Sequence, residues 1–457
     1  MRERWWYKFV QVCQRWRYLV LGSASHLGLC LVCTRGTPVA DMLAHSPPFP
    51  LIIDHDYESH DLATEDEEGT ILALRHRDRV TRVNLRLPVT SLQKLITALD
   101  DEFTMLEYLY IAPPLAAKHN ALLTLPSTFR APHLRLLILS FFSSPIGSPL
   151  LVSAVNLAAL ALRFIQPSTY PHPNGLLQPL SLLPNLETLE IGFCSAVPTR
   201  EIELQLSHSP ILNYVTFPNL HWFSYWGVSA YLEALLPHVA APRLERFRVH
   251  FFNQITFPIL HLLQFTATME NFRFRGVRLL FYHEGVAMFV NVGTGIEDFF
   301  IQVLCRHLDW QVSSMAQVFN ILGPLFSNVT GLNLDYRAHV SSSQAHNQVD
   351  CVLWRELFKS FRHVKTLRVH HGLVGEVSRF LKLDGEPPPE IFPDLEELIC
   401  SHGSVDDKTF AVFIHEREAA GHPLKLIRAH SPTDSEHYFF YSSTKRYSIH
   451  PEPVARQ

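Results

Sequence analysis

The chain has 457 residues, a length that corresponds to about three domains of ordinary size. Its 39 Lys and Arg against 43 Asp and Glu give a net charge of −4, which excludes a strongly basic nucleic-acid-binding chain. Hydrophobic residues make up 47% and Gly only 19 positions, so the chain is expected to fold but lacks the Gly-rich turns of dinucleotide- and phosphate-binding folds.

The first predicted element is an amphipathic helix between residues 9 and 20. Its apolar positions recur at steps of one and three residues and form one face: Phe9, Val12, Cys13, Trp16, Leu19 and Val20. Residues 18–33 are apolar and follow several basic residues, as in a signal peptide. The stretch is too short to span a bilayer and is broken by Gly-Ser-Ala-Ser-His, so we expect neither secretion nor a membrane partner.

Residues 26–78 are expected to form an N-terminal cap or linker. Leu27, Leu29 and Leu31 alternate as in a strand, and the acidic run Glu65–Glu68 is interpreted as a solvated loop. The seven Cys are scattered, and the lone pair Cys30 and Cys33 has no second pair at zinc-finger distance. Reduced thiols in a cytoplasmic or nuclear protein are expected, with no metal.

From residue 79 onward the chain repeats a short motif, Pro-x-Leu-x-x-(Leu/Phe)-x-apolar. Five copies begin at Pro132, Pro184, Pro218, Pro242 and Pro393, far more than chance predicts. Looser apolar triplets fill the gaps: Val80/Val83/Leu85, Leu106/Leu109/Ile111, Leu157/Leu160/Leu162, Met269/Phe272/Phe274, Ile296/Phe299/Ile301, Val329/Leu332/Leu334, Val364/Leu367/Val369 and Leu424/Ile427/Ala429. Because side chains alternate along a strand, each set is expected to face a common core.

The spacing of these sets is typical of the leucine-rich repeat. Twelve steps lead from Val80 to Leu424, about 29 residues a step. Residues 91–99 and 228–239 have apolar positions at helical spacing between strands. We therefore expect an α/β fold: an irregular leucine-rich-repeat solenoid, a curved parallel sheet backed by helices and loops, with a short N-terminal helical cap. An α/β barrel is the alternative, but it needs eight units and a Gly-rich rim.

The expected organisation has four parts. Residues 1–25 are expected to form a short remnant helix at the N-terminus, and residues 26–78 a cap or linker. Residues 79–430 are expected to form the solenoid, and residues 431–457 a loose C-terminal tail. The sequence contains no G-x-S-x-G, H-E-x-x-H or P-loop motif, and its 26 His are dispersed. We therefore expect neither an enzyme nor a cofactor.

The string V-C-Q-R-W-R at Val12–Arg17 resembles the end of an F-box domain. The following run WRYLVLGSASHLGLCLVCTRGTPVADML, the segment SPPFPLIID and the Pro-x-Leu repeats resemble the F-box/leucine-rich-repeat proteins of basidiomycete fungi. This resemblance implies that Val12, Cys13 and Trp16 bind a Skp-type adaptor. An F-box opens with a Leu-Pro-containing helix that MRERWWYKFV does not resemble, so we expect the chain as numbered to bind the adaptor weakly or not at all. Val12 and Trp16 would otherwise cover the end of the solenoid.

A target-binding face follows from the side chains that alternate with the core positions. In three successive units these are Trp222, Ser224 and Trp226; then Arg246, Arg248 and His250; then Asn271, Arg273 and Arg275. If those units are neighbours, Trp222, Trp226, Arg246, Arg248, His250, Arg273 and Arg275 form one patch that suits an acidic or phosphorylated segment. A register slip of one residue would instead bury half of them.

Two functions of different classes follow from these observations. The first is the target-recognition subunit of a Skp-cullin-F-box ubiquitin ligase, with a protein target on the concave face, an adaptor at the N-terminal helix and no nucleic-acid partner. The second is a stand-alone leucine-rich-repeat scaffold for protein interactions, without attachment to a ligase. Binding of a Skp-type adaptor distinguishes the two.

Overall fold

The computed structural model describes residues 8–9, 11–56, 62–114, 122–143, 145–166, 171–194, 210–256, 258–268, 274–291, 297–337, 349–381, 391–401 and 410–429. Sixteen strands of these segments form one open sheet in the order β1-β2-β3-β4-β5-β6-β7-β9-β11-β14-β13-β12-β15-β16-β17-β18. Two short strands, β8 and β10, pair separately. The fold is thus α/β with an open sheet, and the barrel alternative is wrong.

The strands follow the predicted triplets closely along most of the chain. They are β1 (Leu31–Cys33), β2 (Leu51–Asp56), β3 (Val80–Arg86), β4 (Tyr108–Ala112), β5 (Leu136–Ser140), β6 (Ala159–Ile165), β7 (Thr188–Phe193), β8 (Val215–Thr216), β9 (Trp222–Gly227), β10 (Val239–Ala240), β11 (Arg246–Phe251), β12 (Gly276–Tyr282), β13 (Gly285–Asn291), β14 (Glu297–Val303), β15 (Gly331–Arg337), β16 (Thr366–Val369), β17 (Glu397–Ser401) and β18 (Lys425–Ala429).

Helices connect most of these strands. The α-helices are α2 (Gln14–Gly22), α3 (Ala24–Leu27), α4 (Val39–His45), α5 (Thr64–Leu74), α6 (Val89–Ile96), α7 (Pro149–Ser153), α8 (Pro173–Leu180), α10 (Ser229–Leu235), α11 (Leu260–Ala267), α12 (Leu308–Leu322), α13 (Cys351–Phe358), α14 (His371–Leu381) and α15 (Ala411–Ala419). Three 3₁₀ turns are η2 (Pro145–Gly147), η4 (Leu236–His238) and η5 (Gly323–Phe326). The helices expected in 91–99 and 228–239 are confirmed as α6 and α10.

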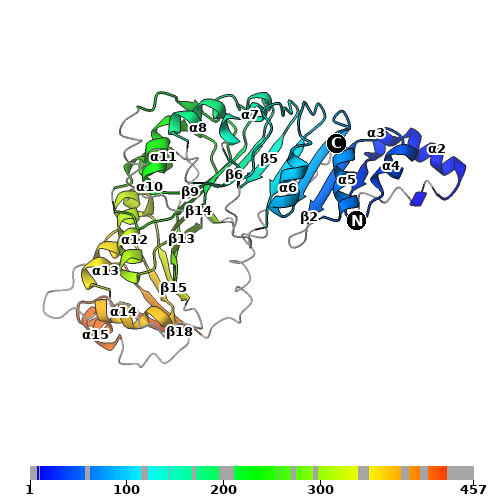
Figure 1. Ribbon diagram of the computed structural model, residues 1–457. Coiled ribbons are helices and arrows are strands. Elements are labelled where there is room, and N and C mark those ends of the chain that lie inside the picture. Colours follow the sequence, from blue (N-terminus) through cyan, green and yellow to red (C-terminus); the bar gives the residue numbers. More distant parts are fainter. Residues whose placement is uncertain are drawn as a thin grey trace.

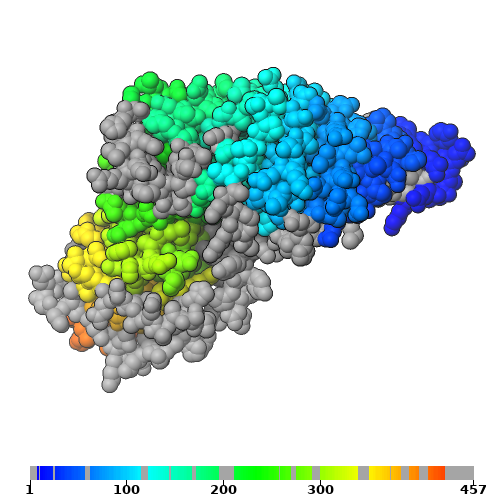
Figure 2. All heavy atoms as spheres, in the orientation of Figure 1, coloured from blue at the N-terminus to red at the C-terminus, as the bar shows by residue number. Residues whose placement is uncertain are grey.

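The sheet bends into an arc. Helices α8, α10, α11, α12 and α13 lie on the outer side of the bend, so the opposite face of the sheet lines its inside (Figure 1). The space-filling view shows the same bend, with the blue and cyan units forming one arm and the yellow units beginning the other (Figure 2). We call the side of the sheet away from these helices the inner face.

Neighbouring strands are parallel from β1 to β11 and from β15 to β18. The exception lies at mid-arc, where β13 runs antiparallel to both β12 and β14. The chain leaves β11, forms β12 three positions further along the sheet, and returns through β13 and β14 until β14 pairs with β11. The sheet is therefore mostly parallel, with one hairpin inserted into it.

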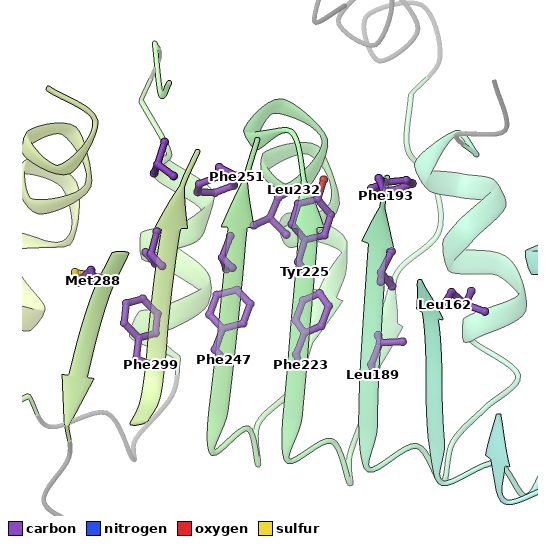
Figure 3. Close-up of a cluster of buried hydrophobic side chains, with 14 of the residues drawn as sticks. Leu162, Leu189, Phe193, Phe223, Tyr225, Leu232, Phe247, Phe251, Met288 and Phe299 are labelled. Carbon is purple, nitrogen blue, oxygen red and sulfur yellow. The ribbon is translucent and has the colours of Figure 1, made fainter. Parts of the chain in front are cut away.

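The predicted apolar positions pack between the sheet and the outer helices. Leu186, Leu189 and Ile191 are buried in this core, and Leu189 pairs with Leu160 of β6 and Phe223 of β9. Figure 3 shows the equivalent positions of successive strands side by side at one level of the core. One continuous apolar cluster extends along the whole arc, from Val20 to Leu424.

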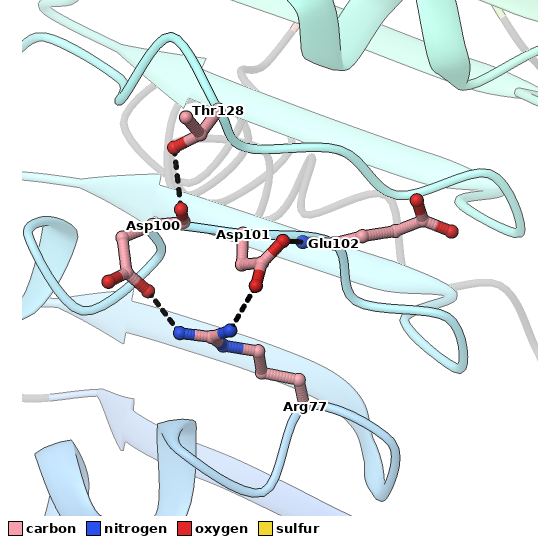
Figure 4. A network of polar contacts seen from close by, with 5 residues as sticks. All are labelled: Arg77, Asp100, Asp101, Glu102 and Thr128. Carbon is pink, nitrogen blue, oxygen red and sulfur yellow. Dashed lines mark hydrogen bonds and ion pairs between the residues drawn. The ribbon is translucent and has the colours of Figure 1, made fainter.

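Polar contacts also join successive units, at the turns beside the sheet. Arg77 contacts the carboxylates of both Asp100 and Asp101, and Nη2 of Arg77 lies 2.6 Å from Oδ1 of Asp100 (Figure 4). The Thr128 hydroxyl of the next unit donates to the carbonyl oxygen of Asp100 at 2.6 Å. These three turns are thereby fixed relative to one another.

The N-terminal part of the arc begins earlier than the sequence predicts. Strands β1 and β2, within residues 26–78, belong to the same sheet as β3, so this region is not a separate cap. The acidic run Glu65–Glu68 lies in the first turns of α5 rather than in a loop. There Asp66 accepts a hydrogen bond from the backbone N–H of Gly36 at 2.7 Å, so the run has a structural partner. Residues 431–457, expected to form a tail, lie outside the described residues.

The register is wrong in two predicted units. In the first, Val277 and Leu279 follow Phe274 in the core, because they pair with Leu332 and Leu334 of β15, and Met269 and Phe272 of the predicted set lie outside the described residues. In the second, Ile427 pairs with the inner-face residue Ile399, so Leu426 faces the core in its place. Both segments are rich in apolar residues, which makes several registers compatible with the motif.

Candidate functional site

Most of the side chains predicted to bind a target lie on the inner face at mid-arc. Five of the seven predicted target-binding residues lie there: Trp222, Trp226, Arg246, Arg248 and His250. They alternate with the buried core residues of β9 and β11, and each is half-buried. Trp222 pairs with Arg246, and Trp226 pairs with His250.

His250 links the aromatic side chains to a polar row across the sheet. Its ring stacks on Trp226 at a centroid distance of 4.0 Å and lies 4.8 Å from the ring of Phe300. Nδ1 of His250 hydrogen-bonds Oε1 of Gln302, and Nε2 of Gln302 donates to the Tyr282 hydroxyl. Burial lowers the pKa of His250 to about 3, and burial raises that of Tyr282 to about 12, so both groups are neutral at pH 7.

The two remaining predicted residues, Arg273 and Arg275, do not extend this patch. Arg273 lies outside the described residues, and Arg275 precedes β12. Strand β12 is separated from β11 by β13 and β14, so the expectation that the three units are direct neighbours is wrong. The physical reason is the inserted hairpin, which places β14 beside β11 in the position expected for the third unit.

The sequence pattern did not identify the residues that occupy this part of the inner face. Strand β14 contributes Phe300 and Gln302 next to β11, and β12 contributes Arg278 and Tyr282 beyond the hairpin. A signal was present: two apolar runs flank His283-Glu284, the two-residue loop that connects β12 and β13. That spacing is typical of a hairpin and would have placed the strands correctly.

A small apolar cluster occupies the inner face between these polar groups. Leu280, Ala287, Phe289 and Phe300 come from β12, β13 and β14, and all four are buried. The guanidinium of Arg278 lies 6.0 Å from the ring centroid of Phe289, at the outer limit of a cation–π contact. A comparable inner-face cluster lies in the N-terminal half, where Leu136, Ile138, Ala159 and Ala161 of β5 and β6 are buried.

Two pairs of opposite charges lie in the N-terminal half of the inner face. Arg163 of β6 forms two parallel hydrogen bonds with the carboxylate of Glu190 on β7, at 2.8 and 2.7 Å. Burial alone would lower the pKa of Arg163, but the charge of Glu190 more than offsets this effect. Arg86 pairs with Asp56 at 3.5 Å. In each of these two pairs the charges are neutralised, whereas the guanidinium of Arg82 lies 4.4 Å from the ring centroid of Tyr108.

The N-terminal motif residues lie on the surface. Val12 is 64% exposed and Trp16 46% exposed, and Cys13 is also exposed. The predicted single helix is wrong, because the chain turns at 11–13 and α2 begins at Gln14; the ring of Phe9 then stacks on Trp16 at 5.5 Å. Of α2, only Val20 is buried. The hypothesis that Val12 and Trp16 cover the end of the core is therefore also wrong.

A groove lies along the edge of the sheet where strands β4 to β9 begin. It has a volume of about 620 Å³, and Met105, Glu107, Arg135, Asn156, Asn185 and Asn219 are among its lining residues. The asparagines occupy corresponding turn positions of successive units, directly before the strands. This groove was not predicted, although Pro-Asn-Leu at 184–186 and at 218–220 marks the position of two of its asparagines.

Within the part of the chain that the structure describes, no three His, Cys, Asp or Glu side chains are grouped so that they could hold a metal ion. No helix of that part is long and apolar enough to cross a membrane. Compared with known proteins, the chain matches no family model and no curated protein with significant similarity.

Proposed function

We propose that this chain is the target-recognition subunit of a Skp-cullin-F-box type ubiquitin ligase, built on an irregular leucine-rich-repeat solenoid. The observation that carries the proposal is the exposed apolar surface of Phe9, Val12, Trp16 and Leu19 at one end of the arc. Leaving large apolar side chains in water is unfavourable, so such a surface favours a protein partner. The motif Val12–Arg17 resembles the adaptor-binding end of an F-box.

In this proposal, the inner face of the sheet binds the target protein. Trp222, Trp226, Arg246 and Arg248 belong to the residue types that dominate binding energy at protein interfaces. They stand on parallel strands with fixed pairing, so little side-chain ordering is needed when a target binds. A protein target on the concave face and an adaptor on the N-terminal helix would thus be held by one continuous core. A cytoplasmic or nuclear location is part of this proposal.

The proposal is tested by the affinity of the full chain for a purified Skp-type adaptor, with Val12→Asp as the test variant. Val152 is 54% exposed on α7, far from the motif along the arc, so Val152→Asp is the matched control. Because MRERWWYKFV does not resemble the opening helix of an F-box, we expect only weak adaptor binding, with a Kd above about 1 µM, that Val12→Asp abolishes and Val152→Asp leaves unchanged. Equal loss in both variants, or no binding even at high protein concentration, would contradict a role in the ligase.

The alternative is a stand-alone scaffold that binds proteins without a ligase. One observation favours it: the inner face is complete without α2, which contributes only Val20 to the core. Under this alternative, Trp226→Ala and Arg248→Glu still weaken target binding, whereas Val12→Asp has no effect on any partner. The two functions are therefore separated by the adaptor experiment alone.

A further inference from the structure

The residues directly before β4, β5, β6, β7 and β9 are joined by a repeated pair of backbone hydrogen bonds. The carbonyl oxygen of Glu107 accepts from the N–H groups of Arg135 and Leu136, at 2.9 and 3.1 Å. The same pair recurs at each following step, with the carbonyl oxygens of Arg135, Ala158 and Glu187 as the acceptors. The side chains at these positions therefore form a regular row along the edge of the sheet, one strand spacing apart.

Four members of this row line the groove at the edge of the sheet: Glu107, Arg135, Ala158 and Glu187. Ala158 has no side-chain atoms beyond Cβ, so the row has a gap at β6 between the longer side chains of Arg135 and Glu187. We call this part of the edge the strand-start groove. An acidic, a basic and a second acidic group thus follow one another along the groove, in an order that the backbone fixes.

The charged side chains of the strand-start groove are available to a ligand. Glu107, Arg135 and Glu187 are exposed, and their charged groups have no hydrogen-bond or ion-pair partner among the residues that the structure describes. The corresponding carboxylate of a later unit differs in this respect: Glu396, directly before β17, accepts a hydrogen bond from Nζ of Lys365 at 2.8 Å. The fold therefore does not use the three charges of the groove, and a partner can pair with all of them.

A row of side-chain amides lines the same groove. Asn156, Asn185 and Asn219 each stand directly before a buried Leu of their unit. The amide of Asn185 has no hydrogen bond among the described residues. Asn156 donates through Nδ2 to the carbonyl oxygen of Pro132 at 3.4 Å, which leaves its Oδ1 as an acceptor. Asn219 accepts through Oδ1 from Arg243 at 3.4 Å, which leaves its Nδ2 as a donor. The row thus offers donors and acceptors, as pairing with a polypeptide backbone requires.

We propose that the strand-start groove binds an extended polypeptide segment of a partner protein with the side-chain pattern basic-x-acidic-x-basic. Glu107 and Glu187 are three strand spacings apart, which is about 14 Å at ~4.8 Å a spacing. In an extended chain, two side chains four residues apart point to the same side and are also separated by about 14 Å. The side chain midway between them then lies close to Arg135. This surface includes neither the inner-face side chains nor α2, so the inference goes beyond the proposed function.

Other classes of charged ligand fit this order of charges less well. Two carboxylates against one guanidinium repel a nucleic-acid backbone, which needs a basic surface along its whole contact. A polyamine can pair with Glu107 and Glu187, but it brings a like charge to Arg135 between them. A polypeptide with an acidic residue between two basic ones pairs with all three groups, and its backbone can pair with the amide row.

The test uses the full chain and three fluorescent peptides of equal length, with binding followed by fluorescence polarisation. The first contains Lys-x-Glu-x-Lys and the second the reversed charges Glu-x-Lys-x-Glu, where x is Ser or Gly. The third has the composition of the first, but its charged residues are adjacent, as Lys-Lys-Glu. We expect the first peptide to bind about tenfold more tightly than either other peptide, a difference that three exposed ion pairs supply together.

Two variants assign the binding to the groove. Glu187→Gln removes one carboxylate, and Ala158→Gln fills the gap at β6 with an uncharged side chain as long as those of the neighbouring units. Each should reduce the preference for the first peptide to about threefold or less. Glu396→Gln is the matched control, because it changes the same position of a unit outside the groove, and it should keep the full preference. Circular dichroism verifies that all three variants are folded.

Several outcomes would overturn the inference. Equal binding of the first and third peptides shows attraction of charge without the proposed spacing, and a preference that Glu187→Gln and Ala158→Gln both leave intact places the binding outside the groove. Binding of spermine or of single-stranded RNA at the affinity of the first peptide assigns the groove to another ligand class. None of these outcomes bears on the adaptor experiment with Val12→Asp.

Discussion

His250 is held in its neutral form by the residues around it. Trp226 stacks on the His250 ring, the Phe300 ring lies close by, and Gln302 hydrogen-bonds Nδ1 of His250. Burial is the main cause that lowers the pKa of His250 to about 3; Arg248 adds to this effect, while the hydrogen bond with Gln302 opposes it. Protonation would bury a positive charge and place it beside Arg248.

This burial makes the stability of the protein depend on pH. The unfolded chain binds the proton near pH 6.5 and the folded protein only near pH 3, so the folded state loses stability as the pH falls through this window. The loss is at most about 1.4 kcal/mol per pH unit and ends near pH 3. His250→Phe keeps an aromatic ring against Trp226 but cannot titrate.

Thermal unfolding between pH 7.5 and pH 5 checks the prediction. The melting temperature of the unmodified chain should fall more steeply than that of His250→Phe. His55, whose pKa is also lowered by burial, contributes equally to both curves and cancels in the comparison. Parallel curves would show that His250 is not the group responsible.

Gly285 is required where β13 approaches β14. A Cβ atom at this position would lie 2.3 Å from the carbonyl oxygen of Val303 and 2.9 Å from the Tyr282 hydroxyl. Gly285→Ala should therefore force the two strands apart and lower the free energy of unfolding by about 1–3 kcal/mol. Gly331 starts β15 with nothing within 4 Å of an added Cβ, so Gly331→Ala is the control. Chemical denaturation of both variants measures the difference.

At the scale of single elements, the strands are held by apolar side chains that stack between units. In the N-terminal half these are aliphatic, whereas in the middle of the arc aromatic rings succeed one another: Phe223 to Phe247 at 5.4 Å and Phe247 to Phe299 at 6.0 Å. The motif Pro-x-Leu-x-x-Phe predicts this change, because Phe replaces Leu at the same strand position. Each ring then contacts the equivalent side chain of the next unit.

Truncation of one such side chain should leave a cavity that the neighbouring units cannot fill. Leu189→Ala on β7 is expected to cost about 2–5 kcal/mol of unfolding free energy, because Leu189 is only 2% exposed between Leu160 and Phe223. Leu182, which is 46% exposed, provides the control: Leu182→Ala should stay within about 0.5 kcal/mol. Urea denaturation distinguishes the two. A small loss for Leu189→Ala would contradict the assigned core.

The hairpin β12–β13 departs from the strand order that a regular repeat predicts. Regular spacing predicts that each strand pairs with the next one in the chain, and this holds from β1 to β7. At mid-arc the two-residue loop His283-Glu284 reverses the chain, and three strands enter the sheet in the opposite order. As a result Arg278 and Arg337 become inner-face neighbours, and Arg275 is separated from Arg248.

At the scale of the whole molecule, each described strand pairs with its immediate neighbours, and none of the described strands closes the sheet. Stability in such an arrangement is close to a sum of units and the interfaces between them, so damage stays local. The continuous core from Val20 to Leu424 nevertheless makes every unit dependent on the next. The edge strands β1 and β18 each have one partner, so they should be the least protected parts of the sheet.

Hydrogen exchange of the intact chain tests this organisation. Leu189→Ala should increase exchange first in β6, β7 and β9, and Leu398→Ala should do so in β16, β17 and β18, because these are the paired strands. In the unmodified chain, β18 should exchange faster than β7. If either variant raises exchange uniformly along the arc, the molecule unfolds as one unit and the local model is wrong.

The sequence alone determined which residues face the core in most units, and with them the mostly parallel α/β sheet. Alternation along a strand is a local property, so Leu189 and Ile191 could be assigned to one side, and Trp226 and His250 to the other, without knowledge of the fold. The N-terminal element was predicted less well, because an amphipathic pattern does not reveal whether its apolar face is covered. In the structure Val12 and Trp16 are exposed.

The tertiary structure decided which of these strands are neighbours. Strand order depends on pairing between residues far apart in the chain, and the apolar stretch at residues 269–281 offers several registers of similar quality. Pairing of Val277 with Leu332 selects one of them and thereby places Arg278 on the inner face, whereas Arg273 lies outside the described residues. Arg278 and Asp335 contact each other because β12 and β15 pair across 57 residues of sequence, a choice set by long-range packing rather than by the local pattern.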